Sequence, residues 1–270
     1  VLSSHFKIDQ SADLAGIDAL LLGTAAVDEA AAKVLGANRK GLLAMEYLLF
    51  DPVGGNAAVL QTLQAAEGGE RRRIYLRSLG RVMRSDVAEL LAAWEPGGGN
   101  YASQISQAGQ GSQAFGTQKT AVDALVNRLI FSAESAELKL SRPLGREAGG
   151  TPQPNQEEAR FSDNSLRDLL EVLEGIRRVY VGPSESGSDV GLSDVLNSQN
   201  AELDARMVSE LGAARQALSS VPAPLRTALS GSSAQVESAR ASLAALHATL
   251  ATEVASNLGV TLKFNDNDGD

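Results

Sequence analysis

The stretch ERRRIYLRSLGRVMRSDVAELLAAW, at residues 70–94, decides the fold class. Its apolar side chains recur every three or four residues, which places them on one face of an α-helix. These residues are Leu79, Val82, Met83, Val87, Leu90, Leu91 and Trp94. The spacing therefore predicts a long amphipathic helix whose apolar face is buried. Charge runs at the edge of such helices are usually solvated, so Arg71 to Arg73 are predicted to be surface residues without a specific role.

Four further segments carry the same helical periodicity: residues 117–140, 165–180, 201–219 and 232–258. Gly259 stands where a C-terminal stop of the last of these helices is expected. No segment shows sustained strand alternation. Residues 260–264 could form an isolated strand or run extended along a helix, and the sequence leaves both open. We predict an all-α fold built from antiparallel helical bundles.

A Gly- and Pro-rich stretch within residues 145–158 is the strongest linker signal in the chain. Glycine and proline favour turns and interrupt helices, so a domain boundary is expected there. We predict an N-terminal helical bundle at residues 1–148, a linker at 149–158 and a C-terminal helical bundle at 159–270. The two bundles are expected to pack side by side.

Composition excludes several classes of function. The chain has 24 basic and 33 acidic residues, a formal charge of −9, so it lacks the basic surface that nucleic-acid binding requires. It has no cysteine, which excludes disulfides, thiolate metal sites and a nucleophilic thiol. No apolar run is long enough to cross a bilayer. Whether a lipid anchor lies upstream is left open by the sequence.

Residues 41–50, GLLAMEYLLF, form a short apolar segment with one carboxylate, Glu46. An isolated buried charge is costly, so a carboxylate in such surroundings must be paired, protonated or bound to a cation. One interpretation is an ion pair with an arginine such as Arg39 or with one from a neighbouring helix. The other is a binding site.

The same segment resembles the GxHAIEYLLF signature of the imelysin-like family, bacterial cell-envelope proteins first classed as peptidases. Further stretches match the family in order: LSRPLG at 140–145, FSDNSL at 161–166, EGI at 174–176 with VYVG at 179–182, and LGVT at 258–261 with FNDNDGD at 264–270. The resemblance therefore spans residues 41–270.

The family's histidine position is occupied by Leu43 in this chain. In the family pattern histidine and glutamate stand three residues apart, on one helix face, where both could bind a metal. A hydrolytic zinc site normally takes three protein ligands, and the chain has only His5 and His247. His247 lies among leucines and is interpreted as a residue at the edge of the core. Glu46 is thus the one candidate metal ligand, for an iron or zinc ion.

The resemblance implies a non-catalytic periplasmic or outer-membrane-associated binding protein linked to iron uptake. We expect its site where the signature helix meets the second domain, with Glu46 facing Ser162, Asp163 and Arg142. Its partner would be a metal ion, a small molecule or an envelope protein. Two alternatives remain: a metallopeptidase of the imelysin type, or a structural and protein-interaction module without a ligand.

Overall fold

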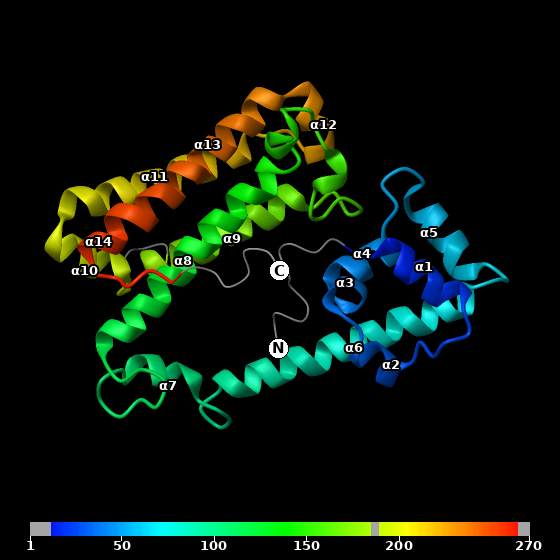
Figure 1. The fold of residues 1–270 in the computed structure, drawn as a ribbon, viewed down its shortest axis with the longest axis horizontal. Coiled ribbons are helices and arrows are strands. Elements are labelled where there is room, and N and C mark those ends of the chain that lie inside the picture. Colours follow the sequence, from blue (N-terminus) through cyan, green and yellow to red (C-terminus); the bar gives the residue numbers. More distant parts are fainter. Residues whose placement is uncertain (1–11, 185–188, 264–270) are drawn as a thin grey trace. The chain divides into compact units, whose positions relative to one another are not determined.

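The computed structural model describes residues 12–184 and 189–263, and within these ranges it contains helices and no strand. The all-α prediction is confirmed (Figure 1). The α-helices are α1 (Leu14–Leu22), α2 (Glu29–Lys33), α3 (Ala37–Lys40), α4 (Leu42–Leu49), α5 (Gly55–Gln64), α6 (Gly69–Trp94), α7 (Tyr101–Ser106), α8 (Gln118–Ser141), α9 (Ser165–Tyr180), α10 (Leu192–Gln199), α11 (Ala201–Ser219), α12 (Leu225–Gly231), α13 (Ser233–Thr249) and α14 (Ala255–Asn257). None of the described helices is long and apolar enough to span a membrane.

The chain divides into two compact units, which differ from the predicted domains. The first unit comprises Val1–Ser103 and Glu158–Asp163, and the second comprises Gln104–Glu157 and Asn164–Asp270. Residues 104–148 therefore belong with the C-terminal helices, because the apolar face of α8 shares their core. A short piece of the predicted C-terminal domain, residues 159–163, belongs instead with the first unit. The side-by-side packing of two bundles stays a prediction.

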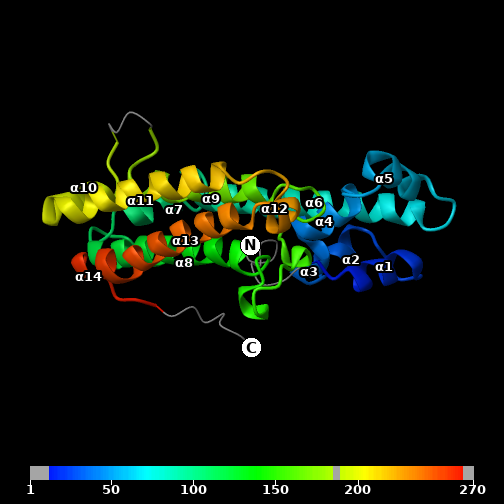
Figure 2. The same cartoon turned by 90° about the horizontal axis from the view of Figure 1, so that it is seen from above.

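The second unit is built around a four-helix bundle. Helix α8 contacts α9, α9 contacts α11, α11 contacts α13, and α13 contacts α8 again, so the ring of helices is closed. Figure 2 shows these four helices running alongside one another. Their shared core is aliphatic, with Leu140, Leu169, Met207 and Leu243 among its fully buried side chains. Long amphipathic segments joined in sequence give this arrangement by burying their apolar stripes together.

The end of the last helix has the stop that the sequence predicted. A π-helical turn, Leu250–Val254, joins α13 to α14. Gly259 then adopts φ +61°, its N–H donates to the Ser256 carbonyl at 3.1 Å, and the Val260 N–H donates to the Ala255 carbonyl at 2.8 Å. These two bonds are the pair that defines a Schellman motif. The chain then runs extended along α8, which settles the open alternative for residues 260–263.

The first unit packs short helices around the N-terminal half of α6. Helices α1, α2, α4 and α5 contact α6. The buried core is small: Ile17, Leu21, Val27, Ala32, Ala44, Leu48, Tyr75, Leu79 and Val82. The prediction that the whole apolar face of α6 is buried was wrong. Val87, Leu91 and Trp94 are 47%, 56% and 44% exposed, because the small core of this unit ends at Val82.

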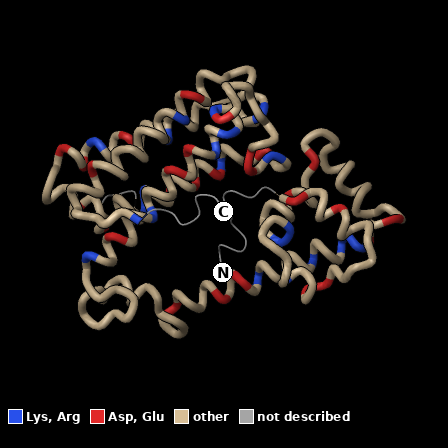
Figure 3. The backbone as a smooth tube through the Cα atoms, in the orientation of Figure 1, with Lys and Arg blue, Asp and Glu red and all other residues tan. Residues whose placement is uncertain are grey.

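The arginines at the start of α6 also correct the sequence prediction. Half-buried Arg71 donates from Nη2 to the Leu20 carbonyl at 2.7 Å and from Nε to the Leu21 carbonyl at 3.2 Å. Arg73 donates to the Leu63 carbonyl. The last carbonyls of a helix lack intrahelical partners, so these arginines satisfy the C-terminal ends of α1 and α5. Elsewhere acidic and basic residues are interspersed along the helices (Figure 3).

Candidate binding site at the signature helix

Helix α4 places Glu46 in the interior of the first unit. The helix begins after Gly41, and its residues Ala44 and Leu48 contribute to the apolar core. Glu46 lies between them in sequence and is 8% exposed. The chain therefore buries a carboxylate within two turns of helix, where its oxygens need hydrogen-bond donors.

The donors come from a segment more than a hundred residues away. Glu46 Oε1 accepts hydrogen bonds from the Ser162 N–H at 2.8 Å, the Ser162 hydroxyl at 2.7 Å and the Phe161 N–H at 3.1 Å. Hydrogen bonds to a carboxylate are short and strong compared with bonds between neutral groups. Glu46 thus fixes the backbone at residues 161–162, within the segment 158–163 that belongs to the same compact unit as α4.

Aromatic and charged side chains surround this connection. The Tyr47 hydroxyl donates to Asp18 Oδ1 at 2.9 Å, and its ring centroid lies 5.3 Å from that of Phe161. The guanidinium of Arg72 lies 5.9 Å from the Tyr47 ring centre, and that of Arg160 lies 4.8 Å from the Phe161 ring centre. Burial, together with the hydrogen bond to Asp18, raises the pKa of Tyr47. These contacts hold Phe161 against α4 beside the Glu46 bonds.

The structure brings together some of the predicted site residues. Glu46 and Ser162 are in direct contact. The sequence assigned them to different predicted domains, but both belong to the first compact unit. Asp163 follows Ser162, is exposed and has φ +60°. Arg142 is the C-cap residue of α8, in the second unit. Ligand binding by these four residues stays a prediction.

Arg39, the arginine that the sequence offered as a partner of Glu46, has a different neighbour. Its Nε lies 3.5 Å from Asp13 Oδ2. The Arg39 carbonyl accepts a hydrogen bond from the hydroxyl of Tyr75, a fully buried residue of α6. The interpretation of Glu46 as the ion-pair partner of Arg39 was therefore wrong.

The family model described as imelysin, which carries a peptidase label, matches residues 8–253. The chain belongs to the imelysin family. It is 29% identical over 223 residues to Iron-regulated protein A of Synechococcus elongatus, a match that covers 80% of this chain and 58% of that protein. The chain thus matches less than two thirds of this relative's length.

A solved structure shares the imelysin-family fold. It is that of a putative iron-regulated protein A precursor from Parabacteroides distasonis. The two structures superpose with a TM-score of 0.71 at 19% sequence identity, over 93% of this chain and 74% of the other. At this identity the likeness establishes the fold.

The residues around Glu46 do not fit the zinc site of an imelysin-type peptidase. Leu43, half-buried one turn before Glu46, offers no metal ligand. Within residues 12–184 and 189–263, no three His, Asp or Glu side chains lie close enough together to hold a metal ion. His247 is half-buried on α13, in the other unit, and His5 lies outside the described residues. A catalytic zinc normally needs three protein ligands and an open position.

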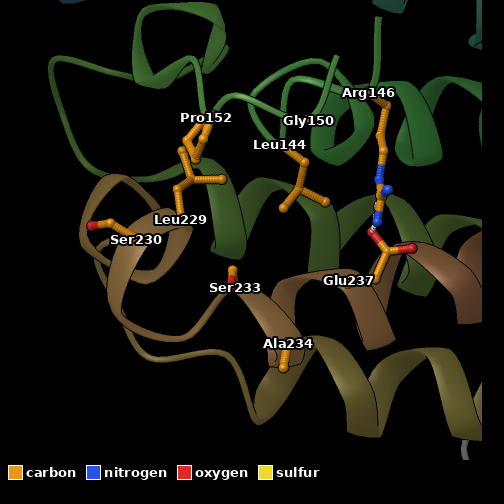
Figure 4. A pocket seen from close by; sticks show the side chains of 9 residues that line it. All are labelled: Leu144, Arg146, Gly150, Pro152, Leu229, Ser230, Ser233, Ala234 and Glu237. Atoms are coloured by element: carbon orange, nitrogen blue, oxygen red, sulfur yellow. Dashed lines mark hydrogen bonds and ion pairs between the residues drawn. The ribbon is translucent and has the colours of Figure 1, made fainter. Parts of the chain in front are cut away.

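A cavity of about 530 Å³ lies in the second unit, where the loop after α8 faces α12 and α13 (Figure 4). Its lining residues are Leu144, Arg146, Gly150, Pro152, Leu229, Ser230, Ser233, Ala234 and Glu237. Arg146 Nε donates to Glu237 Oε2 at 3.1 Å, and Arg240 donates to Glu237 Oε1 at 2.8 Å. The hydrogen bonds from Arg240, followed by that from Arg146, lower the pKa of Glu237.

Sequence reasoning missed this cavity, although one signal for its loop was visible. In the stretch that resembles the family turn, Gly145 has φ +74°, and a Cβ there would lie 1.8 Å from the Thr151 carbonyl oxygen. Only glycine fits such a closed turn. The α12–α13 side of the cavity has no corresponding sequence signal, because tertiary folding brings it there.

Proposed function

We propose that this imelysin-family chain is a non-catalytic binding protein of the bacterial cell envelope, linked to iron uptake. One observation carries the proposal. The signature glutamate is retained and organises residues 161–162 through three hydrogen bonds, whereas the signature histidine is Leu43. The glutamate thus organises this segment, while the described residues provide no ligand set for a catalytic metal.

The named relatives support the link to iron, since both carry the description iron-regulated protein A. That description concerns regulation by iron and leaves the bound species open. We propose that the bound species meets the segment that Glu46 holds, where exposed Asp163 follows the Phe161–Tyr47 aromatic pair. Aromatic faces with a charge beside them suit an organic ligand or a protein better than a bare ion.

The proposed role is tested by iron accumulation in the source bacterium under iron limitation. Deletion of the gene is expected to lower radioactive iron uptake, and the wild-type gene is expected to restore it. Glu46→Ala should fail to restore uptake, because residues 161–162 lose their anchor. The matched control is Asp204→Asn, which alters a buried carboxylate of the second unit and should restore uptake. Unchanged uptake in the deletion strain would overturn the proposal.

Two assays on the purified, metal-stripped chain separate the alternatives. Casein hydrolysis with added zinc is expected to be absent, and zinc-dependent hydrolysis that Glu46→Gln abolishes would establish the peptidase instead. Calorimetric titration with ferrous, ferric and zinc ions identifies the cargo. Iron binding that Glu46→Gln abolishes would make an ion the cargo, whereas binding only by Leu43→His would show that an ion site has been lost.

A further inference from the structure

Residues 261–263 lie along one face of α8, within the second unit. The Thr261 N–H donates to Asp123 Oδ1 at 3.3 Å, and the Lys119 ammonium lies 3.2 Å from the Thr261 hydroxyl. Asn127 contacts the same segment further along, from the next turn of α8. Residues 261–263 are therefore held by side chains of a helix and not by a neighbouring strand.

Asn127 binds the backbone of this segment through both ends of its amide. Its Nδ2 donates to the Thr261 carbonyl at 2.9 Å, and its Oδ1 accepts from the Lys263 N–H at 2.8 Å. The C=O of one residue and the N–H of the second residue after it point to the same edge of an extended chain. The Asn127 amide thus takes the place of a peptide group in a neighbouring strand.

The spacing along α8 suits this role. Lys119, Asp123 and Asn127 stand four residues apart, which is about 6 Å along a helix axis. An extended chain repeats the same edge every two residues, about 6.6 Å. Side chains on successive turns of α8 therefore have nearly the same spacing as the N–H and C=O groups along one edge of an extended polypeptide.

The three side chains are also held in position. Lys119 Nζ lies 2.8 Å from Asp123 Oδ2, and Asn127 Nδ2 donates to the Asp123 carbonyl at 2.7 Å. Among contacts with the described residues, the Thr261 hydroxyl is the side-chain group of the segment that is bound, while Leu262 is 45% exposed. The recognition is almost entirely of backbone, and so it tolerates different sequences.

We propose that Lys119, Asp123 and Asn127 form a docking site for an extended polypeptide, which residues 261–263 of the same chain occupy in cis. The site is independent of Glu46, because it lies in the other unit. Covalent attachment gives the chain's own segment an effective concentration in the millimolar range, so a few surface hydrogen bonds are enough to hold it. A partner polypeptide binds by displacing that segment.

The first test measures tryptic cleavage after Lys263 in the full chain, by intact-mass spectrometry. Cleavage requires a free extended backbone, so the docked segment is protected. Asn127→Leu removes both amide bonds and is expected to speed cleavage about tenfold. Ser132→Ala, which loses a bond to the carbonyl of Arg128 in the same helix, should leave the rate unchanged. An Asn127→Leu rate equal to wild type would overturn the docking of this segment.

The second test asks whether the site accepts a polypeptide in trans. Lys263→Pro removes the N–H that Asn127 binds and leaves α8 intact, so the site is vacated. The Asn127 side-chain amide signal in the NMR spectrum is expected to move in this variant. A capped peptide of residues 259–263 at millimolar concentration should then return the signal toward its wild-type position. A signal that the peptide does not shift would overturn binding in trans. The double variant Lys263→Pro/Asn127→Leu, which lacks the amide, is the control that identifies the Asn127 signal.

Discussion

The two compact units differ in what holds them together. The second unit buries long apolar stripes of α8, α9, α11 and α13 in one continuous core. The first unit has a small core of nine buried apolar residues around half of α6. It gains order from polar contacts between distant segments, such as Arg71 with the end of α1 and Glu46 with residues 161–162. A small core thus leaves more of the fold to specific hydrogen bonds.

A buried carboxylate in each unit sharpens this contrast. Asp204, 9% exposed, accepts hydrogen bonds from the hydroxyls of Tyr180 at 2.8 Å and Ser193 at 2.7 Å, side chains from neighbouring helices of the second unit. Glu46 accepts two backbone N–H bonds and one hydroxyl bond. Asp204 therefore links side chains of helices that an apolar core already packs together. Glu46, in contrast, holds a stretch of backbone in place.

The largest expected effect comes from the apolar core of the second unit. Leu243→Ala, at a fully buried position of α13, should lower the free energy of unfolding of that unit by about 3–4 kcal/mol. Hydrogen exchange read by peptide mass should show the lost protection in α8, α9, α11 and α13. Leu48→Ala is the matched change in the first unit. Equal loss of protection in both units after either change would contradict their separate cores.

A smaller effect is expected at the two carboxylates. Glu46→Ala leaves three donors without an acceptor and should lower the free energy of unfolding of the first unit by about 2–3 kcal/mol. Amide exchange at Phe161 and Ser162 should become much faster, and Glu46→Gln should do less because its amide oxygen still accepts. Asp204→Ala should destabilise the second unit while residues 161–162 stay protected. Unchanged exchange at Phe161 in Glu46→Ala would refute the anchoring role.

The smallest effect concerns pH. Burial raises the pKa of Tyr75, in the first unit, to about 12, compared with about 10 in an unfolded chain. The fold therefore favours the neutral phenol, and its contribution to stability is full below pH 10 and is lost as pH rises toward 12. The loss at pH 11 is on the order of 1 kcal/mol. Urea unfolding at pH 9, 10 and 11 should show a shallower decline for Tyr75→Phe than for wild type, and parallel declines would disprove the link.

Apolar periodicity predicted the long helices well. The segments at 165–180 and 201–219 match α9 and α11, and Gly259 ends the last helix as expected. Periodicity failed for the second half of α6, since it shows that a face is apolar and not whether a partner covers it. The domain boundary was misplaced for a related reason. The linker at 149–158 is irregular in composition, but the helices that flank it, α8 and α9, belong to one bundle.

For the candidate site, the sequence identified Glu46 and Ser162 but not their roles. The motif and the apolar surroundings single out the carboxylate, and the family resemblance pairs it with residues 161–166. Only the folded structure shows that the donors are two backbone N–H groups and a hydroxyl, because Ser162 is 116 positions from Glu46 in the sequence. The resemblance likewise marks residues 258–261, yet nothing in the sequence of these residues indicates that Asn127 binds this segment.

The sequence by itself determined the helical class, the ends of the long helices, the absence of thiol chemistry and the loss of the signature histidine. These properties follow from local spacing, capping residues and residue types, which act within a few turns of the chain. The tertiary structure alone decided which helices share a core, which donors surround Glu46 and where residues 261–263 dock. Those outcomes depend on contacts between distant segments, whose geometry no local pattern contains.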